Sequence, residues 1–381
     1  MLKRFEVLGF KNFAHNFILN FSDVRDYRFN EHCVKNGLLK SGIIYGKNSS
    51  GKSNFSLAIF DIVAHFTDNN ISPGLYGNYL NITNGLNNQH MVNVARFRYT
   101  FLFDKDEIIY DYTKTSSNTL LFEKLTINGD LAFDGEYGST PNQKIINPVY
   151  KATFSPELNF SFHKNGSALK FALNNTAFDK ENPLYKMMIF VSRMLWFRSL
   201  GERENRYIGY KSDADDYYSF ILEDNFALQE FQQLLGVAGV KDTVSVRADA
   251  DGKKRLYTTP ANGMGLIPFF VTASSGTRAL YNLFYWRKTA PDTSLIVIDE
   301  FDAYYHFKLS ETIVDLLSKL PNTQVLLTSH NTNLLTNRIM RPDCFFILTS
   351  EKLTSFANAT NRELREGHNL EKLYAGGEFN E

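Results

Sequence analysis

The chain of 381 residues has only two cysteines, no excess of either charge and no long apolar run. Cys33 and Cys344 are too few for a disulfide scaffold, and they fit a reducing compartment. Lysine plus arginine and aspartate plus glutamate both number 41, so the chain lacks the positive charge of a dedicated nucleic-acid-binding protein, although a local basic patch stays compatible with this composition. The eight histidines lack the spacing of metal ligands, which disfavours a metal centre built on histidine.

Long hydrophobic segments are missing as well. The most apolar stretches, Gly265–Val271 and Ser294–Ile298, are far too short to cross a bilayer, and no apolar signal core follows the first six residues. We therefore expect a cytoplasmic protein without a membrane partner. The composition, with 43% hydrophobic and 22% charged residues, is that of an ordinary globular chain large enough for more than one subdomain.

A loop rich in glycine and serine lies between a strand predicted at Ser41–Tyr45 and a helix predicted at Ser53–Phe66. The backbone N–H groups of such a loop, together with the dipole of the following helix, bind the phosphates of a nucleotide. Lys52 adds a positive charge for the terminal phosphates, and the Ser53 hydroxyl is a ligand for Mg²⁺. A flexible turn would not require this Lys-Ser pair directly after the second glycine. The predicted nucleotide-binding residues are Gly46, Lys47, Asn48, Ser49, Ser50, Gly51, Lys52, Ser53 and Asn54.

Two carboxylates end another apolar strand, predicted at Leu295–Ile298. Asp299 and Glu300 would lie at the carboxyl end of a parallel sheet, where ligands bind. There Asp299 would hold Mg²⁺ through a bound water, and Glu300 would orient or deprotonate the attacking water. An acidic turn after a buried strand is the alternative, but the glycine loop earlier in the chain favours the functional interpretation.

A histidine follows the next strand, which is predicted at Gln324–Leu327. His330 comes one strand and one helix after the two carboxylates, so it could contact the terminal phosphate and report its presence. A histidine that caps a helix or is satisfied within the core is the alternative.

Serine and glycine also open a helix predicted at Ser275–Lys288. Ser275 is a natural N-cap, and capping alone is the simple interpretation. The functional interpretation is a second anion site made by Ser275, Gly276, Thr277 and the helix dipole. One nucleotide cannot easily use two helix starts so far apart in one chain. We therefore expect a two-fold dimer, in which this segment faces the glycine loop of the partner copy.

The middle of the chain predicts a different architecture. A period-two pattern over Val94–Phe133 indicates an antiparallel meander. Helices are predicted at Tyr185–Leu200 and Asp213–Leu235, and Asp251-Gly252 indicates a hairpin turn.

From Leu266 onward strands and helices alternate, which predicts a mainly parallel sheet covered by helices. The predicted strands are Leu266–Val271, Leu295–Ile298, Gln324–Leu327 and Phe345–Leu348, and the predicted helices are Ser275–Lys288, Lys308–Leu320 and Asn331–Arg338. We divide the chain into four parts, at 1–93, 94–150, 151–264 and 265–381.

The order of these motifs resembles that of ABC ATPases. Without a membrane segment, the chain is similar to SMC-like and overcoming-lysogenization-defect-like (OLD-like) ABC ATPases rather than to a transporter subunit. Phe10–Phe13 and Leu364–Tyr374 resemble the first strand–turn and the tail of that group, and the resemblance covers residues 1–135 and 265–350. It implies an α/β P-loop NTPase of ABC type, in which a mainly parallel sheet flanked by helices carries an antiparallel meander and a helical insertion.

The resemblance also implies ATP and Mg²⁺ as cofactors and a role for single residues. Gly46, Gly51, Lys52 and Ser53 would be Walker A, Asp299 and Glu300 Walker B, Ser275 and Gly276 the signature acting in trans, His330 the switch histidine, and Gln89 the candidate Q-loop glutamine that senses Mg²⁺. Thr277 stands where transporters have a second glycine, and His306 stands where their D-loop has an aspartate; both departures resemble the OLD-like branch.

The expected function is an ATPase that hydrolyses ATP in a head-to-tail homodimer, or in a larger oligomer of dimers, and gates a partner. The resemblance suggests bacterial antiphage defence, with a separately encoded effector such as a nuclease. The stretch after His330 is too short for a Toprim domain. Glu300 argues against a switch that does not hydrolyse, and the missing Asn-Lys-x-Asp motif argues against GTP.

An SMC-like DNA-repair clamp is the alternative function. It would require a local basic face, for which the candidates are Arg193, Arg198, Arg203 and Arg206. The zero net charge and the lack of a long coiled coil weaken this hypothesis, and a solvated helix face is the better interpretation of these arginines.

Overall fold

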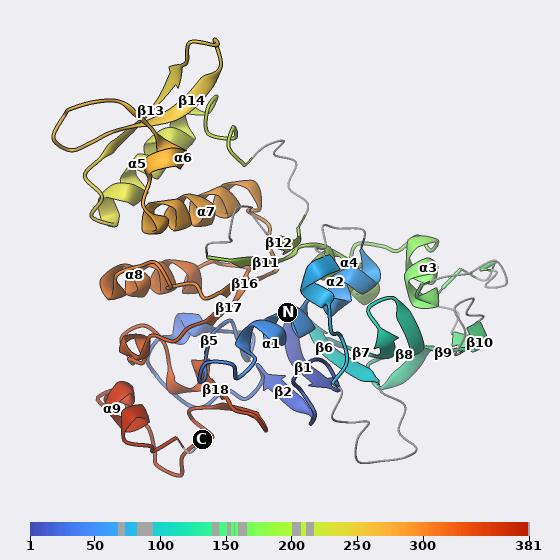
Figure 1. The fold of residues 1–381 in the computed structure, drawn as a ribbon. Coiled ribbons are helices and arrows are strands. Elements are labelled where there is room, and N and C mark those ends of the chain that lie inside the picture. Colours follow the sequence, from blue (N-terminus) through green and yellow to red (C-terminus); the bar gives the residue numbers. More distant parts are fainter. Residues whose placement is uncertain are drawn as a thin grey trace.

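The computed structural model describes residues 1–67, 73–81, 94–138, 145–150, 154–155, 157–158, 166–199, 207–210 and 217–379. Figure 1 shows a core with its helices, an antiparallel sheet beside it, and a small lobe beyond helix α7 (Ser275–Thr289). In the described part of the chain, no helix has the length and apolar character needed to span a membrane.

The core is a mainly parallel sheet of seven strands. Its strands are β5 (Ser41–Tyr45), β11 (Met194–Arg198), β12 (Tyr207–Gly209), β16 (Leu295–Asp299), β17 (Gln324–Thr328), β18 (Phe345–Leu348) and β19 (Leu353–Ser355). They lie in the order β12-β11-β16-β17-β5-β18-β19, and only the two edge strands pair antiparallel. Strands β5, β16, β17 and β18 are buried at every position, as is typical of parallel strands covered on both faces. The predicted parallel sheet is confirmed.

The helices of the core are α1 (Lys52–Ile59), α2 (Asp61–Phe66), α4 (Pro183–Ser192), α7, α8 (Phe307–Ser318) and α9 (Leu370–Ala375). Helices α7 and α8 begin and end within two residues of their predicted bounds, whereas α9 was not predicted. The predicted helix Ser53–Phe66 is divided at Phe60. The prediction of a helix at Asn331–Arg338 is wrong, because only a 3-10 turn forms at Thr332–Leu334. There the Asn331 side chain accepts from the Asn333 N–H, a local bond that competes with helix formation.

The second sheet is antiparallel and also has seven strands. Its strands are β1 (Leu2–Leu8), β2 (Phe17–Asn20), β6 (Ala95–Phe103), β7 (Asp106–Ser116), β8 (Thr119–Ile127), β9 (Asp130–Tyr137) and β10 (Ile145–Tyr150). The order β10-β9-β8-β7-β6-β1-β2 confirms the predicted meander and adds the first two strands of the chain to its edge.

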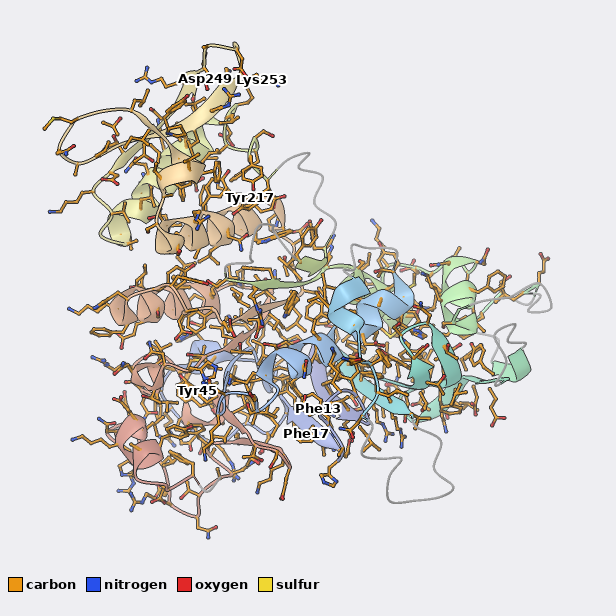
Figure 2. All side chains as sticks on the ribbon, viewed as in Figure 1. Phe13, Phe17, Tyr45, Tyr217, Asp249 and Lys253 are labelled. Atoms are coloured by element: carbon orange, nitrogen blue, oxygen red, sulfur yellow. The ribbon has the colours of Figure 1, made fainter. Side chains whose placement is uncertain are left out.

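A side-chain amide and a group of aromatic rings are among the contacts that join this sheet to the core. The buried Gln324 side chain accepts from the Leu2 N–H at 2.7 Å and donates to the Leu2 carbonyl at 2.9 Å, so it pairs with β1 as another strand would. Phe13 packs against Phe17 (Figure 2) and against Phe55 of α1, with ring centroids 4.7 Å and 5.7 Å apart, respectively. The helix that follows the glycine loop therefore shares its core with the antiparallel sheet.

The prediction of one helix over Tyr185–Leu200 is wrong in its second half. Helix α4 ends at Ser192, and Met194–Arg198 forms β11, which pairs in parallel with β16. The first four residues of β11 are apolar and buried, so the period alone does not distinguish a buried strand from a helix. Pairing with β16 decides the outcome and brings Arg198 opposite Asp299.

The small lobe packs on helix α7 through α5 (Asn225–Val237) (Figure 1). The helix predicted at Asp213–Leu235 corresponds to α5, which begins later, at Asn225, and continues through Gly236 to Val237. Residues 213–216 lie outside the described residues. Strands β13 (Thr243–Ala248) and β14 (Lys254–Thr259) form the predicted hairpin. The strand predicted at Leu266–Val271 is only β15 (Ile267–Pro268), because Pro268 precedes a short helix, α6 (Phe269–Thr272). Its predicted place in the parallel sheet is wrong, since β15 pairs antiparallel with β14 in the small lobe.

The smaller elements complete the described fold. They are β3 (Val34–Lys35), β4 (Leu38–Leu39), α3 (Ala168–Asn174) and the 3-10 turns η1 (Glu31–Cys33), η2 (Pro73–Tyr76) and η6 (Pro342–Cys344).

Candidate functional site

The glycine loop connects β5 to α1 and requires both of its glycines. A Cβ at Gly46 would lie 2.6 Å from the Leu348 carbonyl oxygen, and a Cβ at Gly51 would lie 2.2 Å from Nδ2 of Asn12. Gly51 also has a φ of 99°, a conformation that side chains disfavour. The backbone is therefore held in a tight loop whose last residue starts a helix, which is the geometry expected for a phosphate cradle.

Asn12 supports the outside of this loop. Its Nδ2 donates to the Ser50 carbonyl at 3.2 Å, and its Oδ1 accepts from Nδ2 of Asn54 at 2.8 Å. Sequence reasoning noted Asn12 only as part of a resemblance and missed this contact. The signal that could have found it is the pair of asparagines, Asn12 and Asn54, on either side of the loop.

The Lys52 ammonium lies over the loop. Its Nζ donates to the carbonyls of Gly46 at 2.8 Å and Lys47 at 3.2 Å, and lies 3.5 Å from Nδ1 of His330. Burial lowers the pKa of Lys52, while the negative charges of Asp299 and Glu300 oppose the shift. The structure thus brings His330 from the end of β17 to the predicted phosphate-binding lysine.

Asp299 is fully buried at the end of β16 and has two partners. Its Oδ1 accepts from the Thr328 hydroxyl at 2.7 Å, and its Oδ2 accepts from Nε and Nη2 of Arg198, each at 3.1 Å. Nη2 of Arg198 also lies 3.2 Å from the Ser53 hydroxyl oxygen. Ser53 and Asp299, the two predicted metal ligands, therefore meet around one guanidinium group.

Glu300 follows directly, in a backbone conformation that is rare for a side-chain-bearing residue, with a φ of 51°. Its N–H donates to the Thr328 hydroxyl oxygen at 2.8 Å, and its side chain is 44% exposed. One threonine hydroxyl thus fixes the Asp299 carboxylate and the Glu300 backbone together. Sequence reasoning missed Thr328 because nothing local distinguishes it from any other residue at the end of a buried strand.

His330 is next to a second hydrogen-bonded turn. The Ser329 hydroxyl donates to Oδ2 of Asp302 at 2.7 Å and accepts from the Asn331 N–H at 2.9 Å. Burial, and then the positive charge of Lys52, lower the pKa of His330, so the imidazole is neutral near pH 7 and can accept a hydrogen bond from Lys52. Burial raises the pKa of Asp302.

The start of α7 corrects one detail of the predicted second anion site. Ser274, not Ser275, is the N-cap, because its hydroxyl oxygen accepts from the Thr277 N–H at 3.1 Å. Ser275 is left in the first turn of the helix, and a Cβ at Gly276 would lie 2.8 Å from the Tyr304 carbonyl. Within the described residues, no hydrogen bond joins this helix start to the glycine loop of the same chain.

Two further predictions have different outcomes. Gln89 lies outside the described residues, so its role in metal sensing stays a prediction. His306 lies at the N-cap position of α8, but its side chain makes no capping hydrogen bond.

The basic face proposed for a clamp is not formed by the arginines that the structure describes. Arg193 lies after the last residue of α4 and approaches Asp292 at 3.8 Å, whereas Arg198 ends β11 inside the site. Arg203 and Arg206 lie outside the described residues. The interpretation of Arg198 as part of a solvated helix face is therefore wrong.

The donors at this site fit Mg²⁺ better than a transition metal. In the described part of the chain, no three His, Cys, Asp or Glu residues cluster as metal ligands would. A hydroxyl and a carboxylate oxygen, from Ser53 and the oriented Asp299, are the hard donors that Mg²⁺ prefers when a nucleotide supplies the rest of its ligands.

A glycine loop between the parallel strand β5 and a helix, with two carboxylates at the end of β16, which is separated from β5 by β17, defines a P-loop ATPase. A comparison with family models matches residues 43–336 to the family described as "AAA domain, putative AbiEii toxin, Type IV TA system", and the chain belongs to this family. A search of curated proteins found no match.

Solved structures similar to the chain include head domains of SMC proteins. The SMC head bound to the C-terminal winged-helix domain of ScpA is 14% identical with a TM-score of 0.49, and the match covers 93% of this chain and 97% of that one. The SMC head domain from Thermotoga maritima is 14% identical with a TM-score of 0.42, covering 93% and 98%. The SMC head with an extended coiled coil, bound to a ScpA domain derived from Pyrococcus furiosus, is 11% identical with a TM-score of 0.44, covering 93% and 96%.

Proposed function

We propose that the protein hydrolyses ATP, with Mg²⁺, at sites shared between two head-to-tail copies of the chain. The observation that carries the proposal is the Thr328 hydroxyl, which holds Asp299 and Glu300 beside Ser53 and Lys52 at one edge of the core sheet. Lys52 and the loop backbone would bind the phosphates, and Ser53 and Asp299 would hold Mg²⁺, which supplies charge neutralisation when bound. Glu300, whose exposed side chain is free to reach solvent, would orient or deprotonate the attacking water.

The dimer is proposed from the position of the second anion site. Ser275 and Gly276 start α7, a helix with no hydrogen bond to the glycine loop of its own chain among the described residues. In a two-fold arrangement, each helix start would face the triphosphate bound by the partner copy, with its dipole directed at the phosphates. His330 would then report the terminal phosphate through its contact with Lys52.

The biological role is proposed from the family. Its description names a toxin and a toxin–antitoxin system, which supports an ATPase that senses a signal and gates a separately encoded effector, such as a nuclease, in antiphage defence. The clamp alternative has no specific support, because Arg193 and Arg198 do not form a shared basic face.

Substitution of Glu300 tests the proposed chemistry. Glu300→Gln keeps the size of the side chain and removes its charge, so we expect ATP binding to persist while turnover falls by about a hundredfold or more. Phosphate release would measure turnover, and light scattering with ATP would show an accumulated dimer.

The matched control is Glu311→Gln on α8, a carboxylate whose described partner is Arg338. Turnover in this control should stay at the wild-type rate. Unchanged turnover in Glu300→Gln would refute the role of Glu300, and a wild-type chain without ATP turnover would refute the proposed activity.

A further inference from the structure

Arg198 places a positive charge where the proposed function places a metal ion. Its guanidinium donates twice to Oδ2 of Asp299, lies 3.2 Å from the Ser53 hydroxyl oxygen, and has Nε 4.0 Å from Oε2 of Glu300. The two proposed Mg²⁺ ligands and the proposed base therefore share one cationic partner, which comes from β11.

A buried carboxylate needs such a partner. Asp299 is fully buried, and an unpaired charge there would be strongly destabilising. The Thr328 hydroxyl already occupies Oδ1, so Oδ2 is the oxygen left for a cation, and Arg198 bonds to it. A guanidinium on Oδ2 and a divalent ion held by the same carboxylate through a bound water would repel each other, so one excludes the other.

The exchange requires only a side-chain movement. The Arg198 backbone is fixed by its register opposite Asp299 and by Nδ2 of Asn282, which donates to the Arg198 carbonyl at 3.2 Å. The side chain, in contrast, is 42% exposed, so it can leave Asp299 through a rotamer change without disturbing the strand.

We propose that Arg198 is a competing cation that holds Asp299 and Ser53 until a divalent ion arrives with a nucleotide. The inference rests on the proposed function, because it uses the assignment of Ser53 and Asp299 to Mg²⁺. Metal alone is a weak competitor for Arg198. Metal with nucleotide displaces it, since the phosphates add ligands for the ion and a new anionic partner for the guanidinium. Arg198 therefore couples metal binding to nucleotide binding.

Binding of Mn²⁺ to the nucleotide-free full chain tests this competition. Free Mn²⁺ is titrated by electron paramagnetic resonance, with no turnover involved. Arg198→Ala should bind Mn²⁺ about tenfold more tightly than the wild type, because a charge-assisted pair no longer competes for Asp299. With the analogue AMP-PNP present, this advantage should disappear.

The matched control is Arg193→Ala, which removes an arginine of similar exposure, 44%, that approaches Asp292 instead. It should bind Mn²⁺ as the wild type does. The double variant Arg198→Ala/Asp299→Asn should lose the gain, which would place the Mn²⁺ at Asp299. If Arg198→Ala does not fold, as thermal unfolding would show, Arg198→Gln replaces it, because its amide can still donate to Asp299 without a charge.

The outcomes separate the inference from the proposed function. Equal Mn²⁺ affinity in the wild type and the Arg198 variant, including no binding in either, overturns the inference even if the wild type hydrolyses ATP. An advantage that persists undiminished with AMP-PNP also overturns it. Tighter Mn²⁺ binding by Arg198→Ala in a chain that shows no ATP turnover supports the inference and refutes the proposed activity.

Discussion

At the scale of single residues, the site depends on groups that orient rather than react. The Thr328 hydroxyl donates to Asp299 and accepts from the Glu300 N–H, so it fixes both the orientation of the Asp299 carboxylate and the backbone turn at Glu300. The unusual backbone of Glu300 persists because this hydroxyl holds it.

Thr328→Val should therefore lower activity without removing any proposed catalytic group. The substitution keeps the shape of the side chain but leaves Oδ1 of Asp299 and the Glu300 N–H without their partner. We expect turnover to fall by about 10- to 100-fold, as for other residues that orient metal ligands. Thr328→Ser keeps the hydroxyl and should retain most of the rate, and loss of activity in both variants alike would contradict the role of the hydroxyl.

At the scale of elements, a buried polar cluster joins α2 and α3 to the antiparallel sheet. Glu123 of β8 accepts from Tyr110 at 2.8 Å, from the Leu169 N–H at 2.9 Å, and from the hydroxyls of Tyr137 and Ser167. Burial alone would raise the pKa of Glu123, but hydrogen bonds from His65, Ser167 and Tyr137 outweigh it and lower the pKa. One fully buried carboxylate thus binds three elements together.

Removal of the Glu123 carboxylate should lower the free energy of unfolding. Glu123→Ala removes the acceptor that four buried donors share, and we expect a loss of about 3–5 kcal/mol in the free energy of unfolding. Urea denaturation measures the loss. Glu136→Ala on the neighbouring strand β9 removes an exposed carboxylate and should change stability little, so equal losses in the two variants would contradict the prediction.

The same cluster predicts a dependence on pH. Burial lowers the pKa of His65 below its ordinary value of 6.5, so below that pH the unfolded chain takes up a proton that the folded chain does not. Stability therefore falls as the pH drops through 6.5, and the lowered pKa of Glu123 adds a further loss below 4.5. Urea midpoints at about pH 7.5 and about pH 5.5 would measure the first effect, which His65→Gln should remove. If the urea midpoint of His65→Gln still falls between these two pH values, another group causes the pH dependence.

The sequence predicted those parts of the site that depend on short spacing. The glycine loop, the two carboxylates and His330 each follow a recognisable strand, and the structure places them at one edge of the sheet. Arg198 could not be predicted in the same way, because its position depends on the pairing of β11 with β16 across about a hundred residues of sequence. The cap at Ser274 was missed for a smaller reason: two adjacent serines are equally suitable, and only the backbone decides between them.

At the scale of the whole molecule, each active site of the proposed dimer contains residues from both chains. Lys52→Ala would inactivate the glycine loop of its own chain, and Ser275→Arg would inactivate the helix start offered to the partner. Each variant alone should be inactive. An equal mixture should recover about a quarter of the wild-type rate, because half of the dimers then contain one intact site of two. Absence of rescue after subunit exchange would contradict the head-to-tail arrangement.

The amide of Gln324 has a consequence for how motion would travel through the protein. It pairs with both backbone groups of Leu2, while its own strand, β17, leads to Thr328 and His330. A shift of β17 would therefore move strand β1 of the antiparallel sheet in the same direction. The position of the antiparallel sheet and the occupancy of the proposed nucleotide site would then depend on each other.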